Sequence, residues 1–425
     1  MVSPTPPAPH GRSGLRAVHA VAAPDGAAVL RRILPAVATA LEGGPAVLPL
    51  PEGPPALRDH LLATLRPSLP VELPDEVDGS GQLDPVALVV PTSGSTGEPK
   101  GVMLGAAALR ASATATVARL GGPGRWLLAL PATHIGGLMV IVRSVLEGQE
   151  PVALDLSGGF DAESFAAASM RVLATSRTRR YTALVPVQLG RLLDAGGAPV
   201  DALCAYDAVL VGGAAISPRL LARAMAAGVN VVTSYGMTET CGGCVYDGLP
   251  LDGVRVSVAP DGRLRIGGDV LARGYRLQPE LTEDAFAGGW FTTSDLGRVT
   301  GEGRVEVHGR MDDVALSGGM NVPLAAVDAV VGLHPGVAEV VAVALPDEEW
   351  GQRVVAVVVP VDPDAPPTLE SVRAAVARRA PVAHAPRALL LVESLPSRGN
   401  GKPDRRAATD LARAALTPAD GETDR

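Results

Sequence analysis

The amino-acid sequence predicts an α/β protein, with a large layered α/β domain, a β-rich subdomain and a small α+β domain at the C-terminus. Three observations support this fold class. Short apolar runs alternate with helical patterns over residues 86–232, alternating β-type runs fill residues 254–308, and a compact set of strands and one helix follows residue 312. Such alternation is typical of a sheet layered with helices. With 425 residues, the chain is long enough for two or three domains.

Hydrophobic periodicity predicts the individual elements along the chain. Residues 1–14 are rich in proline and are expected to be disordered. Helices are predicted at residues 27–41, 55–65, 106–120, 137–146, 161–175, 218–227 and 369–379. Strands are predicted at residues 46–51, 126–130, 181–185, 208–211, 229–233, 263–266, 304–307, 337–345, 354–360 and 388–392. We therefore expect a large domain over residues 15–311 and a small domain over residues 312–425.

Composition and charge exclude several classes of protein. The net charge of -8 and a pI near 5.5 leave no basic stripe for nucleic-acid phosphates, so no nucleic-acid partner is expected. The N-terminus lacks a signal-peptide core and no run is long enough to span a membrane, so the sequence predicts a cytoplasmic protein. Three cysteines fit a reducing compartment.

Two of these cysteines, Cys241 and Cys244, have the spacing of a redox or zinc site. The sequence contains no second CxxC pair and no nearby histidine that would complete a zinc site, so a structural or pocket-lining role is favoured. A redox or zinc protein is the alternative interpretation.

The stretch VALVVPTSGSTGEPKG, residues 86–101, joins an apolar strand pattern to a loop of Gly, Ser and Thr. Small residues let backbone N–H groups turn toward an oxyanion, and hydroxyls and an ammonium complete the coordination. A P-loop is excluded, because Lys100 lies between Pro99 and Gly101 instead of between Gly and Ser or Thr. A flexible linker is the alternative. The predicted phosphate-binding residues are Thr92, Ser93, Gly94, Ser95, Thr96, Gly97 and Lys100.

Lysine usage gives an independent indication of function. Only two of the 37 basic residues are lysines, Lys100 and Lys402, and both lie in loops that contain glycine. Because an ammonium and a guanidinium differ in size and geometry, this distribution indicates sites where arginine does not substitute. Chance is the alternative explanation.

The segment TSGSTGEPKG resembles the phosphate-loop signature of the adenylate-forming superfamily, which includes acyl-CoA ligases, peptide synthetase adenylation domains and luciferases. The resemblance implies the adenylate-forming enzyme fold, with a mobile C-terminal domain. Compared with the family, the N-terminal region is shortened. The substrates and cofactors implied are ATP, Mg²⁺, CoA and a small carboxylic acid, and a homo-oligomer is left open.

Further segments match the nucleotide site of that superfamily. In SYGMTE, the resemblance places Tyr235 and Gly236 at the adenine, Thr238 at the α-phosphate and Glu239 on Mg²⁺. A carboxylate suits a hard cation, although an isolated Glu is usually a surface residue. The segment LVGGAA resembles a turn at which the backbone of the family's enzymes approaches adenine, although paired glycines also make ordinary turns. This segment adds Gly213 and Ala214 to the predicted nucleotide site.

The segments TSDLG and HGRMDD resemble the family's ribose site and hinge. Asp295 would accept hydrogen bonds from both ribose hydroxyls, Arg310 would contact ribose and phosphate, and Asp312 would be the hinge of the small domain. Without the resemblance, a turn or capping role is the simpler reading of Asp295. One departure concerns CoA: the family often has a lysine shortly after the paired acids, where this chain has Ala315 and Leu316.

The last motif, LPSRGNGKPDRR, resembles the family segment that carries the catalytic lysine, here Lys402. A lysine on a glycine-rich loop is otherwise usually solvated. In LPATHIGG, the resemblance gives His134 a place in the acyl pocket and thiol tunnel, whereas a lone His is more often structural. The resemblance predicts an acyl site made of His134, Gly137, Met237, Gly242 and Gly243.

The resemblance implies a two-step reaction. The substrate carboxylate attacks the α-phosphorus of ATP and releases pyrophosphate, and the thiol of CoA then attacks the acyl-adenylate. Small residues at Gly242 and Gly243 leave room for a ring in the acyl group. Ligases for a benzoate-like or medium-chain acid, and a non-catalytic relative that senses ATP, are the alternatives.

Overall fold

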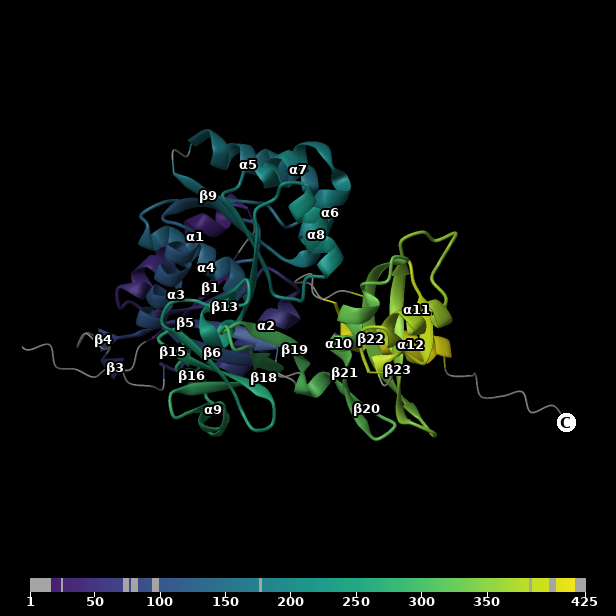
Figure 1. Cartoon of the computed structure of the whole chain (residues 1–425). Coiled ribbons are helices and arrows are strands. Elements are labelled where there is room, and N and C mark those ends of the chain that lie inside the picture. Colours follow the sequence, from purple (N-terminus) through teal and green to yellow (C-terminus); the bar gives the residue numbers. More distant parts are fainter. Residues whose placement is uncertain are drawn as a thin grey trace, which may run out of the picture.

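A computed structural model describes residues 17–23, 26–71, 76–77, 83–93, 99–175, 178–381, 384–396 and 403–416. Figure 1 shows a large N-terminal part, purple to green, beside a smaller C-terminal part, green to yellow. The predicted disordered residues 1–14, the loop residues Gly94 to Gly97, and Lys402 lie outside the described residues.

The first sheet has the strand order β1-β2-β5-β6-β16. Its strands are β1 (Val18–Ala23), β2 (Ala46–Pro51), β5 (Val86–Ser93), β6 (Pro99–Gly105) and β16 (Gly274–Tyr275). Helix α1 (Ala27–Leu41) packs on one face and α2 (Pro55–Leu65) on the other. Successive residues of β2 point to opposite faces, so Val47 faces α1 while Leu48 faces α2. Both faces of this sheet are therefore buried.

Strands β5 and β6 form an antiparallel hairpin in which Thr92 pairs with Lys100 and Ser93 with Pro99. The sequence predicted only the strand before the loop, because residues 99–105 are short and interrupted by glycine. The predicted phosphate loop is consequently the connection of a hairpin, whereas a P-loop leads from a strand into a helix.

The second sheet has the order β13-β12-β11-β10-β9-β7-β8, and its central strands run parallel. Its strands are β7 (Gly124–Leu128), β8 (Val152–Ala153), β9 (Arg179–Leu184), β10 (Ala208–Gly212), β11 (Val231–Met237), β12 (Gly242–Tyr246) and β13 (Leu249–Pro250). The predicted strands match these elements within a few residues. Parallel strands joined through helices are the expected form of a layered α/β sheet.

Helices cover both faces of this second sheet. Trp126 faces the layer that contains α1, α3 (Ala106–Arg119) and α4 (Ile135–Leu146), while Leu127 faces the opposite layer. The opposite layer consists of α5 (Ala162–Thr175), α6 (Pro186–Ala195), α7 (Gly197–Cys204) and α8 (Pro218–Ala226). The α1, α3 and α4 layer thus lies between the two sheets (Figure 1).

A third, antiparallel sheet forms the β-rich subdomain and follows the second sheet in sequence. Its order is β14-β15-β18-β17, and β19 pairs with β18. The elements are β14 (Val254–Val258), β15 (Arg263–Gly268), α9 (Pro279–Ala285), β17 (Phe286–Ala287), β18 (Trp290–Val299) and β19 (Val305–Arg310). Strand β16, which lies between β15 and α9 in sequence, instead joins β6 of the first sheet.

The C-terminal part has its own sheet, in the order β21-β20-β23-β22 with β24 beside β23. Its core lies on both faces of that sheet, under α10 and α11 on one side and α12 on the other. The elements are η2 (Met311–Asp313), β20 (Val314–Ser317), β21 (Met320–Pro323), α10 (Leu324–Val331), β22 (Val337–Asp347), β23 (Gly351–Pro360), α11 (Leu369–Ala377), β24 (Ala388–Leu391) and α12 (Arg405–Leu416). This separate core supports the domain boundary that we propose at Asp312.

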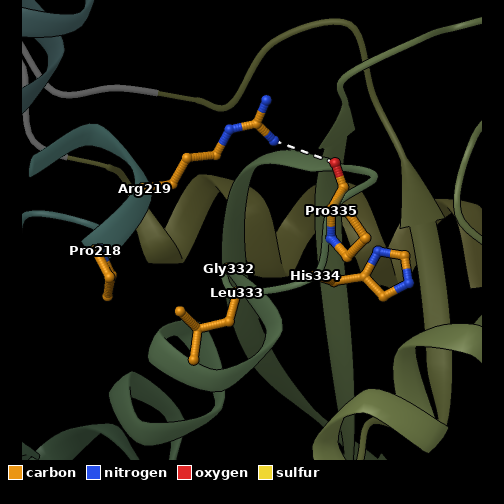
Figure 2. Close-up of a pocket in the computed structure, with 6 residues that line it drawn as sticks. All are labelled: Pro218, Arg219, Gly332, Leu333, His334 and Pro335. Carbon is orange, nitrogen blue, oxygen red and sulfur yellow. Dashed lines mark hydrogen bonds between the residues drawn. The ribbon is translucent and has the colours of Figure 1, made fainter. Parts of the chain in front are cut away.

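The two parts meet where α8 approaches the segment between α10 and β22. The Nη1 atom of Arg219 donates hydrogen bonds to the carbonyls of Pro335, at 3.2 Å, and Val337, at 3.3 Å. Figure 2 shows Arg219 reaching across a shallow pocket of about 400 Å³ toward Pro335. Pro218, Gly332, Leu333 and His334 also line this pocket. No helix among the described residues is long and apolar enough to cross a membrane.

Candidate active site

The SYGMTE segment lies at the carboxyl end of β11, where ligands collect in parallel α/β sheets. Its backbone is tightly constrained by β12. A Cβ on Gly236 would lie 2.1 Å from the carbonyl oxygen of Gly242, and a Cβ on Gly243 would lie 2.1 Å from the Oγ of Ser234. A side chain at Gly236 would meet the backbone of β12, so the close approach of the two strands requires glycine at this position of the motif, whereas one at Gly243 would have to displace the side chains of Ser234 and Tyr246.

Tyr235 connects the second sheet to the third. Its hydroxyl donates a hydrogen bond of 2.7 Å to Oδ2 of Asp295, which lies on β18. Burial and the neighbouring Asp295 raise the pKa of Tyr235, so the phenol keeps its proton and acts as the donor. The structure therefore brings together the predicted adenine and ribose residues, which are 60 positions apart in sequence.

Arg310 lies directly opposite Asp295 in the β18–β19 ladder. Its Nη1 is 3.9 Å from Oδ1 of Asp295, while Nε and Nη2 donate to the two carboxylate oxygens of Asp312 at 2.9 and 3.0 Å. Two parallel bonds of this kind hold a guanidinium and a carboxylate in one plane. Arg310 thus contacts both the predicted ribose residue and the predicted hinge residue.

Glu239 lies in the short helix η1 (Thr238–Thr240), between the second sheet and β16 of the first. The hydroxyl of Tyr275 donates to Oε1 of Glu239 at 3.0 Å, and the Nζ of Lys100 lies 5.2 Å from the centre of the Tyr275 ring. Burial raises the pKa of Glu239, whereas hydrogen bonds and the positive charges of Lys100 and Arg310 act in the opposite direction.

This donor set fits a magnesium ion bound to a nucleotide. Mg²⁺ is commonly held by one or two carboxylates together with phosphate oxygens and water. The bond from Tyr275 engages Oε1 of Glu239, so it does not by itself occupy Oε2. Lys100 supplies a cation on the same side, where phosphate charge would need to be balanced.

Tyr275 was not among the residues that the sequence indicated. A single tyrosine after Gly274, in a β-rich stretch, has no spacing that distinguishes it from a core aromatic residue. Its role becomes visible only because β16 pairs with β6 and so lies beside Lys100. The one local feature of the sequence that could indicate a polar role is the position of Tyr275 between two arginines, Arg273 and Arg276.

Other predicted nucleotide residues lie close to this region. Thr92 donates a hydrogen bond of 3.4 Å from Oγ1 to the carbonyl of Lys100 at the base of the hairpin. Gly213, with φ +79°, and Ala214 follow β10, whose last residue Gly212 pairs with Ser234 next to Tyr235. The roles of Ser93 to Gly97 and of Lys402 stay predictions, since neither the Ser93 side chain nor residues 94–97 and 402 are described.

The predicted acyl residues gather where α4 meets the β11–β12 ladder. Met237 pairs with Gly242 in that ladder, and a Cβ on Gly242 would lie 3.3 Å from Cγ of Met139 on α4. His134 is exposed and directly precedes α4. Gly137 lies in the first turn of α4, where a Cβ atom would lie 2.3 Å from the carbonyl oxygen of Pro131. The start of α4 and the β11–β12 ladder therefore lie side by side, while the pocket role of these residues stays a prediction.

Cys241 and Cys244 are fully buried in the core beside this region. Burial raises the pKa of both thiols, that of Cys244 to about 12. Since zinc binding and disulfide exchange need the thiolate, these side chains behave as small apolar groups. Among the described residues, no group of three or more His, Cys, Asp and Glu side chains is arranged to hold a metal ion without a ligand's help.

Family models match most of the chain. The model described as AMP-binding enzyme matches residues 13–275, and the AMP-binding enzyme C-terminal domain matches residues 326–402. The chain belongs to the AMP-binding enzyme family. The resemblance to the adenylate-forming superfamily and the α/β fold class are confirmed.

This AMP-binding enzyme is similar in sequence to several named acid–CoA ligases. A probable 2-succinylbenzoate–CoA ligase from Mycobacterium tuberculosis (strain CDC 1551 / Oshkosh) is 47% identical, over 92% of this chain and 97% of the relative. A 2-succinylbenzoate–CoA ligase from Listeria monocytogenes is 31% identical, over 76% of this chain and 69% of the relative. An indoleacetate–CoA ligase from Aromatoleum aromaticum is 32% identical, over 74% and 65%.

Solved structures extend the similarity to the fold. The o-succinylbenzoate CoA synthetase from Bacillus subtilis, in complex with the acyl-adenylate intermediate OSB-AMP, superposes with a TM-score of 0.66 at 25% identity. The match covers 89% of this chain and 81% of that chain. ATP-bound MatB from Rhodopseudomonas palustris has a TM-score of 0.76 at 22% identity, over 95% and 90%, and shares the fold of this AMP-binding enzyme.

Proposed function

We propose that this AMP-binding enzyme is an ATP-dependent acid–thiol ligase that joins 2-succinylbenzoate to CoA in menaquinone biosynthesis. The products are the succinylbenzoyl-CoA thioester, AMP and pyrophosphate. The observation that carries the proposal is the 47% identity to a probable 2-succinylbenzoate–CoA ligase over nearly the full length of both chains. The contacts of Tyr235 with Asp295, and of Tyr275 with both Glu239 and Lys100, support its ATP-binding part.

The first half-reaction makes the carboxyl group reactive. A carboxylate resists nucleophiles because it is negatively charged and has a poor leaving group. Its oxygen attacks the α-phosphorus of ATP, the bond to pyrophosphate breaks, and the acyl group is left joined to AMP. Glu239 would hold Mg²⁺, and the bound ion would supply positive charge against the negative charge of the phosphate oxygens.

The chain's own residues would bind and orient ATP for this attack. The ring of Tyr235 would stack on adenine, and Gly213, Ala214 and Gly236 would leave space beside it. Asp295 would accept the ribose hydroxyls, because a carboxylate can accept two donors. Thr238 would contact the α-phosphate.

Cations and the glycine-rich loop would balance the charge of the triphosphate. The loop from Thr92 to Lys100 would hold the β- and γ-phosphates, while Arg310 would contact ribose and phosphate. Lys402 would stabilise charge that develops as the carboxylate attacks. The distance of 3.9 Å between Nη1 of Arg310 and Oδ1 of Asp295 supports the role of Arg310 beside the ribose.

The second half-reaction would follow rotation of the small domain about Asp312. The rotation would withdraw Lys402 and let the CoA thiolate attack the acyl carbonyl, with AMP leaving. His134, Gly137, Met237, Gly242 and Gly243 would line the acyl pocket and the path of the thiol. The contact of Gly242 with Met139 on α4, and its pairing with Met237, support a shared location for these segments.

A specific observation also favours a second candidate: relatives named for other acids, such as an indoleacetate–CoA ligase, are about as similar as the more distant 2-succinylbenzoate enzymes. Acid-dependent pyrophosphate release should therefore be measured with 2-succinylbenzoate, benzoate and a medium-chain fatty acid. We expect 2-succinylbenzoate to give the highest kcat/KM. A higher value for another acid would favour another acyl- or aryl-CoA ligase, and ATP binding without acid-dependent AMP would indicate a nucleotide-binding relative.

A further inference from the structure

Tyr275 lies between two charged residues of the candidate active site. Its side chain is 5% exposed. The hydroxyl donates to Oε1 of Glu239 at 3.0 Å, and the ring centre is 5.2 Å from the Nζ of Lys100. One side chain therefore contacts both the carboxylate that would bind Mg²⁺ and the ammonium that would bind phosphate.

The backbone of Tyr275 is held on both sides. Tyr275 pairs with Val102 in the β16–β6 ladder, two residues beyond Lys100, and its N–H donates to the Oγ1 of Thr282 at 2.9 Å. The ring packs edge-on against Phe286, with 5.7 Å between ring centres. The position of the Tyr275 ring relative to Lys100 is thus set by a β ladder and by aromatic packing.

Glu239 approaches the same segment through its backbone. Its carbonyl accepts a hydrogen bond of 2.8 Å from the N–H of Ala272, three residues before Tyr275. Glu239 is therefore joined to this segment at two points, one in the main chain and one in the side chain. The main-chain bond fixes the backbone of Glu239 beside this segment, and the side-chain bond directs its carboxylate toward Tyr275.

We propose that Tyr275 is a positioning residue for adenylation: its hydroxyl orients the Glu239 carboxylate, and its ring face holds the Lys100 ammonium beside it. The inference rests on the proposed function, since it assumes that Glu239 and Lys100 serve a magnesium-bound triphosphate. A cation over an aromatic face is attracted by the ring quadrupole, and a hydrogen bond to a ligating carboxylate fixes its orientation.

The hydroxyl and the ring can be tested separately by substitution. Tyr275→Phe keeps the ring against Lys100 and Phe286 but removes the donor to Glu239. Tyr275→Leu removes both. Tyr206→Phe is the matched control, because the hydroxyl of Tyr206 donates to the Oγ of Ser169 at 2.9 Å within the opposite helical layer.

Two binding measurements and one rate distinguish these roles. ATP binding is measured by calorimetry in EDTA, Mn²⁺ binding is measured by electron paramagnetic resonance with a non-hydrolysable ATP analogue, and pyrophosphate exchange is measured against Mg²⁺ concentration. For Tyr275→Phe we expect Mn²⁺ affinity to fall, and the half-saturating Mg²⁺ concentration to rise, by about tenfold or more. ATP affinity in EDTA should stay unchanged.

For Tyr275→Leu we expect the same change toward the metal and, in addition, a loss of ATP affinity in EDTA of about two- to fivefold. Tyr206→Phe should match the wild type in all three measurements. Thermal unfolding of each variant identifies those that fold. The proposal is overturned if folded Tyr275→Phe binds Mn²⁺ as tightly as Tyr206→Phe does, or if it loses ATP affinity in EDTA.

The outcome separates this inference from the proposed function. If the wild type releases no pyrophosphate with 2-succinylbenzoate, the proposed substrate is wrong, while the ATP and Mn²⁺ measurements still test Tyr275. If the wild type is active and Tyr275→Phe has an unchanged Mg²⁺ dependence, the substrate stands and the positioning role is wrong.

Discussion

Individual side chains link sheets that are separate in the fold. Tyr235 on β11 reaches Asp295 on β18, and Tyr275 on β16 reaches Glu239 in η1. In each pair, a phenol whose pKa is raised by burial donates to a carboxylate. Such charge-assisted bonds are stronger than neutral ones and set the geometry of the carboxylates before a ligand binds.

Replacement of Asp295 tests the first of these pairs. In Asp295→Asn, the carboxylate charge that accepts from Tyr235, and that would accept from ribose, is lost. Since hydrogen bonds to charged groups contribute about 1.5–3 kcal/mol, ATP affinity should fall by about 10–100-fold. Calorimetry of ATP binding measures this directly.

The control for Asp295→Asn is Asp261→Asn in the same subdomain, where the exposed carboxylate accepts from the side chain of Arg263 at 2.7 Å. That variant should bind ATP as the wild type does. Equal ATP affinities for the two variants would contradict a ribose-binding role for Asp295.

At the scale of elements, a buried arginine joins helix α2 to the segment that carries Tyr275. Arg276 follows Tyr275 and is 1% exposed. Its guanidinium donates to backbone carbonyls at and beyond the end of α2, at 2.7–3.1 Å, namely those of Leu65, Arg66, Leu69 and Pro70. A cation is favoured there because the carboxyl end of a helix carries partial negative charge and unpaired carbonyls.

Arg276→Lys should therefore lower the free energy of unfolding by about 2–4 kcal/mol, because an ammonium cannot reach all of these carbonyls and leaves buried acceptors unpaired. Urea unfolding followed by circular dichroism measures the change. Arg110→Lys is the matched control, since Arg110 donates to a single carbonyl, that of Leu41 at the end of α1, at 2.9 Å. We expect about 1 kcal/mol or less for Arg110→Lys, and a similar cost in both variants would refute the capping role of Arg276.

At the scale of the whole molecule, the two domains divide the proposed reaction. The small domain carries Lys402 on a segment whose flanks are joined, because the N–H of Asp404 donates to the carbonyl of Pro396 at 2.8 Å. Arg405 then holds the start of α12 to Asp313, at 3.2 Å, and to Asp328, at 2.9 Å. The start of α12 is therefore held to residues next to the proposed hinge.

Lys402→Ala should lose adenylation far more than thioester formation. We expect pyrophosphate exchange to fall by about 10²–10³-fold, as is typical when one group that stabilises transition-state charge is removed. Formation of the thioester from preformed acyl-adenylate should change little. Both rates are measured separately, with Arg406→Ala as the control because Arg406 is exposed on the adjacent first turn of α12. Equal losses in both half-reactions would contradict the proposed division.

The stability of the small domain should depend on pH through two histidines. Burial lowers the pKa of His384, and burial together with the charge of Arg378 lowers the pKa of His334, below the usual value near 6.5. Below pH 6.5 the two histidines bind protons more readily in the unfolded chain than in the folded one. The contribution of the neutral histidines to stability is therefore complete above pH 6.5 and is lost as pH falls through their lowered folded-state pKa values. The unfolding temperature should decrease on acidification from pH 7.5 to about 5.

The double variant His334→Gln, His384→Gln should show a shallower dependence of the unfolding temperature on pH, measured by calorimetry. His19→Gln, an exposed position on β1 of the large domain, is the control. An unchanged pH profile in the double variant would show that other groups dominate the acid sensitivity.

Much of the fold is visible in local sequence pattern. Helices α1 and α2 and strand β2 have the predicted bounds, since their apolar periodicity is continuous and their ends carry glycine or proline. The sequence does not predict strand β6, because glycine interrupts it, yet Gly101 is closely packed there: a Cβ would lie 2.9 Å from Cδ2 of Leu65 and 3.1 Å from Cγ1 of Val89. Tertiary packing, rather than strand propensity, therefore explains this residue.

The sequence alone determined the family motifs, the order of the elements and the identity of the predicted nucleotide residues, because each depends on a contiguous stretch of chain. The tertiary structure decided which of these residues meet. Tyr275 contacts Glu239 across 36 positions, and Arg276 contacts Leu65 across 211. Such pairs leave no local pattern, since they arise only when separate sheets pack and bury their polar groups against one another.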